Sequence, residues 1–275
     1  MAISSKPSNF MSSPFAQIIT DNDLNFALNL CKQAGELVSN YFYQGVSVTL
    51  KTDQSPVTIA DQECELLIRN RIKEIYPDDA ILGEEGGDSF GQKPNAIRRW
   101  IIDPIDGTYN FARKIPLFSI LLALEVNGQI ELGIIYNPIL NDLYYAKKGL
   151  GAYKNSELIK VSPCSNLNSA LFNFGAINRI FDHNLTANFI QLVKSTYRQR
   201  GFGDYLNFGL VFEGKAELAL EIGLKPWDLA PMAIIATEAG GKFTSLNGVN
   251  SIYEGNCLVS NKILHQEVLA ILNSK

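Results

Sequence analysis

The run Trp100-Ile-Ile-Asp-Pro-Ile-Asp-Gly-Thr-Tyr-Asn-Phe111 contains the features that decide the fold. A short apolar stretch, typical of a buried strand, leads directly into two carboxylates, Asp103 and Asp106. Pro104 and Ile105 separate them, and proline fixes its own φ and stiffens the turn. We therefore expect both carboxylates to converge on one point, with the backbone carbonyl of Ile105 between them.

The two residues after this pair add a candidate anion site. If a short helix begins at Gly107 and Thr108, its first backbone N–H groups point outward and favour a phosphate. Converging carboxylates repel each other and raise one pKa unless a cation lies between them. Oxygen ligands without His or Cys favour Mg²⁺ over Zn²⁺. The alternative interpretation is an ordinary Asp/Gly turn that caps a helix.

Two further acidic segments strengthen the prediction of a cation site. Gly83-Glu84-Glu85-Gly86 follows another short apolar strand, and its alternative interpretation is an exposed acidic loop. Pro226-Trp227-Asp228 precedes an apolar helix, where Asp228 is well placed as the N-cap. Capping and metal binding by the same carboxylate are compatible.

Composition predicts a globular chain that is not exported. Of its 275 residues, 46% are hydrophobic and 19% charged, which is enough apolar material for a full core. Glu, Gly, Asn or Pro interrupts the longest apolar stretches, so none resembles a membrane span. The first twenty residues lack the apolar core of a signal peptide. We expect a cytoplasmic protein without membrane contact.

Charge and cysteine usage narrow the function classes. The net charge is −4 with a pI near 5.3, and the chain has no long Lys/Arg-rich run. Nucleic-acid binding is therefore not predicted. The four cysteines form no CxxC pair, and only two histidines are present. This pattern disfavours a disulfide framework, a thiolate metal site and zinc chemistry of the HExxH type.

Periodicity predicts an α/β chain with a substantial antiparallel component. We expect a flexible lead-in over 1–20, an N-terminal half over 21–165 with the metal site, and a C-terminal half over 166–275 that completes it. Asn127-Gly128 is a strong hairpin signal. Helices are expected over 21–43, 58–76, 184–197, 208–214, 228–239 and 264–272. Strands are expected over 46–51, 80–83, 100–103, 117–126, 130–136, 143–146 and 152–161, and near 171 and 258.

The motifs together resemble the inositol monophosphatase family of Mg²⁺-dependent phosphomonoesterases, over roughly residues 20 to 273. The segments that carry the resemblance occur in the family's order: Ser55-Pro-Val-Thr-Ile-Ala-Asp61, Gly83-Glu84-Glu85, Asp103-Pro-Ile-Asp-Gly-Thr108 with Asn110-Phe111, Gly149-Leu-Gly-Ala152, Trp227-Asp228 and Glu238-Ala-Gly-Gly241. The resemblance implies a layered α/β/α/β/α architecture, commonly assembled as a homodimer. It also implies two or three Mg²⁺ ions in each active site.

The resemblance further implies a role for each matching residue. Glu84, Asp103 and the Ile105 carbonyl would hold one Mg²⁺. Asp103, Asp106 and Asp228 would hold a second. Thr108, hydrogen-bonded to Asp61, would join Glu84 in orienting the attacking water. The substrate phosphate would lie on the N–H groups of Gly107 and Thr108.

The substrate is less constrained than the reaction. Gly203-Asp204 and the residues that follow it resemble the histidinol-phosphate phosphatase branch of the family. A carboxylate at Asp204 suits an amine, although helix capping is the alternative interpretation. Glu221 matches the position where inositol enzymes bind a substrate hydroxyl, and Lys51 matches a basic residue of a mobile loop at the metal site. We expect Asp106, Asp204, Glu221 and Lys51 to contact the substrate.

The expected substrates are therefore histidinol phosphate and inositol monophosphate, both small phosphorylated metabolites. Fructose-1,6-bisphosphate and 3'-phosphoadenosine 5'-phosphate are alternatives. A haloacid-dehalogenase phosphatase is disfavoured, because its DxDGT motif has one residue between the carboxylates, whereas Pro104 and Ile105 separate them here. A non-catalytic regulatory or binding protein on the same fold is the alternative from another class. The complete set of candidate ligands favours an enzyme.

The carboxylate pair yields the first test. We expect Asp103→Asn to abolish phosphate-ester turnover and leave the fold intact, because the change removes one negative ligand and preserves side-chain size. Steady-state kinetics at saturating Mg²⁺, with circular dichroism as the folding control, measures this. A variant with near wild-type kcat would contradict the assigned role of Asp103.

Overall fold

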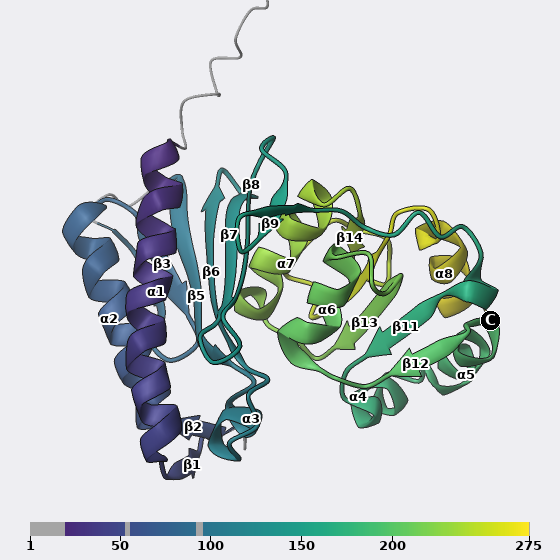
Figure 1. The fold of residues 1–275 in the computed structure, drawn as a ribbon, viewed down its shortest axis with the longest axis horizontal. Helices are drawn as coiled ribbons and strands as arrows, with labels where there is room; N and C mark the ends of the chain where they lie inside the picture. Colours follow the sequence, from purple (N-terminus) through teal and green to yellow (C-terminus); the bar gives the residue numbers. More distant parts are fainter. Residues whose placement is uncertain (1–19, 53–55, 92–95, 275) are drawn as a thin grey trace, which may run out of the picture.

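Helices and sheets alternate in five layers in the computed structural model, which describes residues 20–52, 56–91 and 96–274 (Figure 1). This arrangement confirms the predicted α/β/α/β/α architecture. From one side of the molecule to the other, the layers are α1 (Asp21–Gln44) with α2 (Ile59–Ile75), an eight-stranded sheet, α6 (Asp204–Phe212) with α7 (Pro226–Glu238), a five-stranded sheet, and α4 (Ile177–Asp182) with α5 (Thr186–Ser195) and α8 (His265–Leu272). The predicted lead-in lies outside the described residues except for Thr20, and the division into two halves stays a prediction.

The eight-stranded sheet has the order β10-β9-β8-β7-β6-β5-β3-β4. Only β3 and β5 pair in parallel; the other neighbours in this sheet are antiparallel. The predicted hairpin is confirmed, because Asn127 and Gly128 join β6 to β7 with φ of 50° and 75°. The strands are β3 (Ala80–Gly83), β4 (Gly87–Ser89), β5 (Arg98–Asp106), β6 (Ser119–Val126), β7 (Gln129–Asn137), β8 (Asp142–Lys147), β9 (Ala152–Lys154) and β10 (Glu157–Ile159).

The five-stranded sheet has the order β12-β11-β13-β15-β14. Its first three strands are parallel, and β15 runs antiparallel to both β13 and β14. These strands are β11 (Leu171–Phe174), β12 (Arg198–Arg200), β13 (Leu218–Ile222), β14 (Lys242–Thr244) and β15 (Asn256–Ser260). A separate ribbon pairs β1 (Val48–Leu50) with β2 (Pro56–Thr58), and the short helices α3 (Thr108–Ala112) and η1 (Leu167–Ser169) complete the elements.

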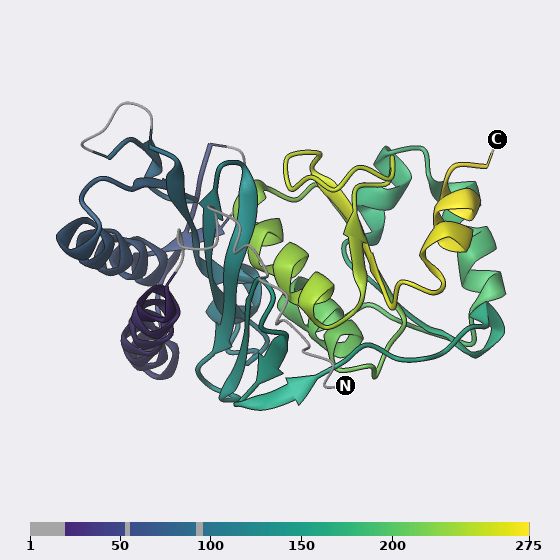
Figure 2. The ribbon, with the colours of Figure 1, turned by 90° about the horizontal axis from the view of Figure 1, so that it is seen from above.

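The helix α7 occupies the centre of the molecule, between the two sheets (Figure 2). Every residue from Leu229 to Ala236 is buried. A helix that is apolar on all sides is stable only inside a core. Its contact with β7 is close: a Cβ added at Gly133 would lie 2.5 Å from Cγ2 of Ile234 and 2.8 Å from Cα of Pro231. Glycine at this position therefore sets how near α7 lies to the first sheet.

Three predicted helices differ from the structure. The helix expected over 208–214 is α6, which begins at Asp204 because Gly203 and Asp204 adopt positive φ and turn the chain into the helix early. The helix expected over 228–239 begins at Pro226 with Lys225 as its N-cap, so Asp228 is the third helical residue and not the cap. Pro231 consequently lies beyond the first turn. The helix expected over 184–197 is α5, which is shorter and is preceded by α4.

Two strand boundaries also differ. The strand expected over 152–161 is a hairpin of β9 and β10, because Asn155 and Ser156 both have left-handed φ and reverse the chain. The strand expected over 46–51 is limited to β1.

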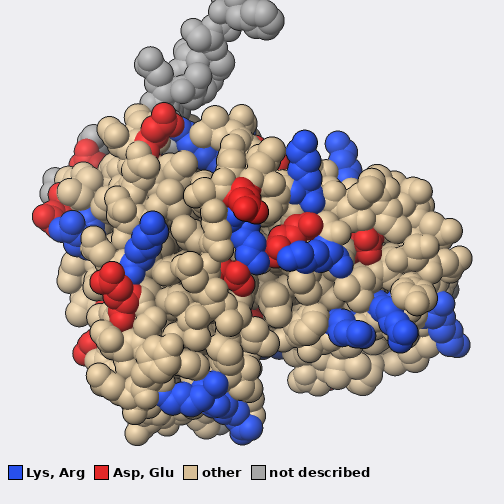
Figure 3. All heavy atoms as spheres, viewed as in Figure 1, with Lys and Arg blue, Asp and Glu red and all other residues tan. Residues whose placement is uncertain are grey.

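Charged side chains of both signs are scattered over the face in Figure 3, and Lys and Arg gather over α4, α5 and β12.

The α7–β7 contact can be tested by filling it. We expect Gly133→Val to lower the free energy of unfolding by about 1–3 kcal/mol, because the new side chain must displace Ile234 or the helix backbone. Urea unfolding followed by circular dichroism measures the change. Gln129→Val, at an exposed position of the same strand, is the matched control. Equal stability of both variants would contradict the close packing.

Candidate active site

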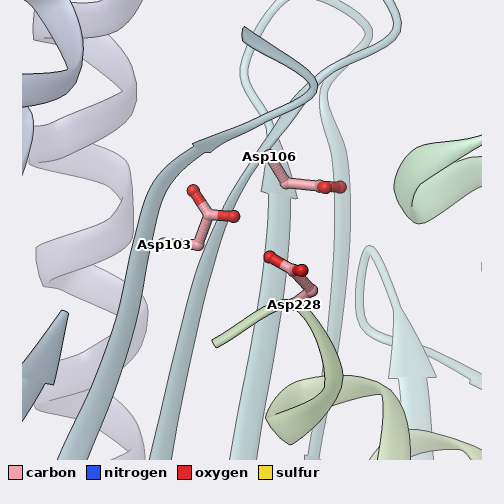
Figure 4. A group of neighbouring side chains, drawn as sticks. All are labelled: Asp103, Asp106 and Asp228. Carbon is pink, nitrogen blue, oxygen red and sulfur yellow. The ribbon is translucent and has the colours of Figure 1, made fainter. Parts of the chain in front are cut away.

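Three carboxylates converge where the first sheet meets α7 (Figure 4). Asp103, Asp106 and Asp228 each offer an oxygen, and these oxygens lie within 4.8 Å of one another. Asp103 is 2% exposed, and the other two are partly buried. Residues more than 120 positions apart in the sequence thus form one acidic cluster.

The carboxylates on β5 converge because the strand is irregular at its end. Asp103 pairs with Leu121 and Asp106 with Ser119, so the register shifts between them and Pro104 and Ile105 bulge out of the ladder. The backbone N–H of Ile105 donates to Oδ1 of Asp103 at 3.0 Å. This bulge confirms the expected convergence of the two side chains, although Asp106 also accepts from the backbone N–H of Tyr205 at 2.9 Å.

The third carboxylate is held by the first turn of α7. The backbone N–H of Lys225 donates to Oδ2 of Asp228 at 2.7 Å, as in a capping box. The sequence interpretation of Asp228 as the N-cap was wrong, but the carboxylate still satisfies an orphan N–H at the helix start. Figure 4 shows this side chain directed toward Asp103 and Asp106.

Crowding makes the cluster electrostatically costly in its ionised form. Burial, followed by the negative charges of Glu84 and Asp228, raises the pKa of Asp103 well above its ordinary value. Burial, followed by the charges of Asp204 and Asp228, does the same to the pKa of Asp106. Burial is also the main cause that raises the pKa of Asp228 to about 6. A cation at this point would relieve the repulsion.

Thr108 lies beside the cluster at the start of α3. Its hydroxyl lies 3.1 Å from Oδ1 of Asp61 and 3.1 Å from the carbonyl oxygen of Ile105, and it can donate to either. Asp61 is fully buried and accepts from the backbone N–H and the hydroxyl of Thr58, which confirms the capping box predicted from Thr58 and Asp61. Gly107, with φ of 85°, is the N-cap of α3, which begins where the sequence predicts a short helix.

Glu84 and Lys51 lie together at the edge of the site. Nζ of Lys51 lies 2.8 Å from Oε1 of Glu84 and 2.5 Å from Oε1 of Glu85. The negative charge of Glu84 contributes to the raised pKa of both Asp103 and Asp228. Glu84 therefore lies near the cluster, although it is not one of the three converging carboxylates. The ammonium of Lys51 is therefore engaged by this acidic loop.

A buried ion pair that sequence reasoning missed supports the Glu84 loop. Glu65 of α2 accepts from the backbone N–H groups of Glu85 at 2.7 Å and Gly86 at 2.8 Å. Arg69, one turn along the same helix, donates to Glu65 at 2.6 Å. A signal was present in the sequence, because both charged residues fall on the face of α2 that also carries buried apolar side chains.

Asp204 lies next to the turn at Gly107. Nδ2 of Asn110 donates to Oδ2 of Asp204 at 2.7 Å, and a Cβ at Gly107 would lie 3.0 Å from the same oxygen. Burial, then the charge of Asp228, raises the pKa of Asp204 to about 6. The structure thus brings Asp204 to the cluster, through a contact with Asn110 that no local pattern indicates.

Glu221, near the end of β13, is 5% exposed, and the charge of Asp204 acts on it. Burial is the main cause that raises its pKa to about 8, and Asp204 and Asp228 add to the effect. The side-chain amide of Asn207 donates to Oε1 of Glu221. The site therefore combines a group of three carboxylates with two further acidic side chains that can accept hydrogen bonds from a ligand.

Comparisons with known proteins agree with this geometry. Residues 20–275 match the model of the inositol monophosphatase family. The chain is 36% identical to the histidinol-phosphatase of Mycobacterium tuberculosis, over 93% of this chain and 100% of that protein. It is 38% identical to the histidinol-phosphatase of Chlorobaculum parvum, over 92% and 97%.

A solved structure gives the same result. The Thermotoga maritima IMPase superposes with a TM-score of 0.82 at 34% identity and covers 92% of this chain and 97% of its own. No helix in the described ranges is long and apolar enough to span a membrane. The chain belongs to the inositol monophosphatase family and is a phosphoric monoester hydrolase.

Proposed function

We propose that this protein hydrolyses histidinol phosphate, or a closely similar phosphate monoester with an amine or hydroxyl groups, and that it requires Mg²⁺. The observation that carries the proposal is the convergence of Asp103, Asp106 and Asp228 beside the turn at Gly107 and Thr108. The histidinol-phosphatase relatives support the choice of substrate. Inositol monophosphate is the second candidate, supported by the fold neighbours described as inositol monophosphatases.

The donor set fits Mg²⁺. The ligands offered are hard oxygens. Burial and then mutual repulsion raise the pKa of these carboxylates, and a divalent cation would offset the repulsion. Asp103, Asp106 and Asp228 would hold the cation, with Glu84 and the Ile105 carbonyl completing the set. When bound, Mg²⁺ supplies a water of lowered pKa and offsets the negative charge on the phosphate oxygens. Two or three ions per site stays a prediction from the family resemblance.

The residues of the chain position the reactants. We assign the Thr108 hydroxyl, close to both Asp61 and the Ile105 carbonyl, to orient the attacking water together with Glu84. The backbone N–H groups of Gly107 and Thr108 would receive the phosphate. Water would attack phosphorus directly, so no phosphorylated side chain forms. Prealignment of this kind lowers the barrier chiefly by reducing the entropy lost at the transition state.

Asp204, Glu221 and Asp106 would set the substrate preference. All are acceptors, so they suit an alcohol part that carries N–H or O–H donors, and the surplus of negative charge favours an ammonium. Lys51 pairs with Glu84 and Glu85 and so neutralises part of that loop, and its contact with the substrate stays a prediction. The homodimer, the cytoplasmic location and the absence of nucleic-acid binding remain predictions.

Phosphate release from a panel of esters tests the proposed substrate. The panel contains histidinol phosphate, inositol-1-phosphate, fructose-1,6-bisphosphate and 3'-phosphoadenosine 5'-phosphate, each with Mg²⁺ and with EDTA. We expect kcat/KM for histidinol phosphate to exceed the others at least about tenfold, a gap of roughly 1.4 kcal/mol. A preference for inositol-1-phosphate would assign a structural role to Asp204. Equal release in EDTA would refute the metal requirement.

Thermal unfolding tests the metal site without a substrate. In EDTA we expect Asp228→Asn to raise Tm by about 2–4 °C, because it relieves repulsion while its amide oxygen still accepts from Lys225. Mg²⁺ should raise the Tm of the wild type and have little effect on the variant. Asp182→Asn, the same charge change at an exposed position, is the control. An unchanged wild-type Tm at millimolar Mg²⁺ would contradict the site.

A further inference from the structure

Asn207 lies at the centre of α6 and connects two parts of the substrate site without reaching the surface. Its side chain is 0% exposed. Its amide nitrogen donates to Oε1 of Glu221, and its amide oxygen accepts from the backbone N–H of Gly203 at 3.1 Å. One side chain therefore holds both a carboxylate on β13 and the turn that presents Asp204.

Through its amide nitrogen, Asn207 determines where the Glu221 carboxylate lies. A Cβ added at Gly175 would lie 1.6 Å from Oε2 of Glu221, so the carboxylate occupies the space that any other residue at 175 would fill. With Gly175 on one side and the Asn207 amide on the other, the carboxylate has little freedom. A buried acceptor that lost this donor would bear a desolvation penalty and would move.

Through its amide oxygen, Asn207 fixes an unusual turn at Gly203 and Asp204. Gly203 and Asp204 have φ of 75° and 51°, a conformation that non-glycine residues adopt at some cost in free energy. The bond from Gly203 to Asn207 closes this turn, and Asn110 holds the Asp204 carboxylate at its far end. The direction of Asp204 into the site thus depends on the same amide group that places Glu221.

A second asparagine fixes Asn207 itself. Nδ2 of Asn173, on β11, donates to the backbone carbonyl oxygen of Asn207 at 3.1 Å. Asn173 is 0% exposed, and its side-chain oxygen is the one buried side-chain polar atom without a hydrogen-bond partner within the described ranges. The five-stranded sheet thus tolerates the unsatisfied side-chain oxygen of Asn173, whose amide nitrogen holds the backbone of α6 in place.

We infer that Asn207 is a positioning residue that sets the spacing of the Glu221 and Asp204 carboxylates, and thereby selects esters whose alcohol part offers N–H or O–H donors to both. The inference rests on the proposed function, because it concerns how the same site recognises its substrate. Asn207 acts through its two neighbours and does not touch the substrate. A purely structural asparagine would affect stability alone, whereas this role predicts a loss of discrimination.

The test measures how well Asn207→Asp hydrolyses two substrates, one whose alcohol part carries N–H donors and one whose alcohol part carries none. The aspartate keeps an acceptor for Gly203 but loses the donor and places a second carboxylate against Glu221. We expect the ratio of kcat/KM for histidinol phosphate to kcat/KM for p-nitrophenyl phosphate to fall at least about tenfold, mainly through KM. Glu221→Gln should lower the ratio similarly, and the double variant should lose no more than the larger single effect.

Two further variants separate positioning from stability. Asn261→Asp is the matched control, since Asn261 is also buried and donates to two backbone carbonyls, but at the opposite end of the second sheet; its ratio should equal that of the wild type. Gly175→Ala displaces the Glu221 carboxylate from the other side and should lower the ratio even if Asn207→Asp does not fold.

The outcomes distinguish the two proposals. Wild-type protein without Mg²⁺-dependent release of phosphate from any of these esters would overturn the proposed function, and the inference with it. If the wild type is active, an unchanged ratio of the two kcat/KM values in folded Asn207→Asp would overturn the inference alone. If Asn207→Asp does not fold, an unchanged ratio in Gly175→Ala would do the same. Additive losses in the double variant would also overturn it, because a positioning residue and its target must act as one unit.

Discussion

Repulsion among Asp103, Asp106 and Asp228 is the interaction on which the rest of this structure depends, because only the packing of α7 brings Asp228 to the other two carboxylates. Two come from the bulged end of β5 and one from the first turn of α7. Holding like charges this close opposes folding, so packing elsewhere must offset it. The cost is concentrated where the chemistry takes place, as is common for sites that bind a cation.

The layer between the sheets, which holds the largest of the three clusters of buried apolar residues, contributes to the offsetting stability. Each large apolar side chain removed from water contributes about 1.5–3 kcal/mol, and α7 buries residues on all its sides against both sheets. The approach at Gly133 then decides how near the helix start lies to the end of β5. The same packing that stabilises the fold therefore sets the distance between Asp228 and its partners.

The sequence was sufficient for the parts of the site that follow from local chemistry. The exit of β5, the capping box of Thr58 and Asp61, and the Asn127-Gly128 hairpin each depend on a few neighbouring residues. The start of α6 was not predictable in this way, because the left-handed conformation of Asp204 is maintained by bonds from Asn110 and to Asn207. Lys225 as the cap of α7 was equally hidden, since lysine is not a preferred N-cap residue.

The burial of α7 on all sides also has a consequence for cooperativity. Neither sheet alone covers α7. A fragment that ends before α7 would expose the apolar face of the first sheet, and a fragment of α7 with the second sheet would expose one side of the helix. We therefore expect the two sheets to unfold in a single transition and not one after the other. The backbone amides of α7 should then be among the slowest in the chain to exchange with deuterium, since they open only when the whole molecule does.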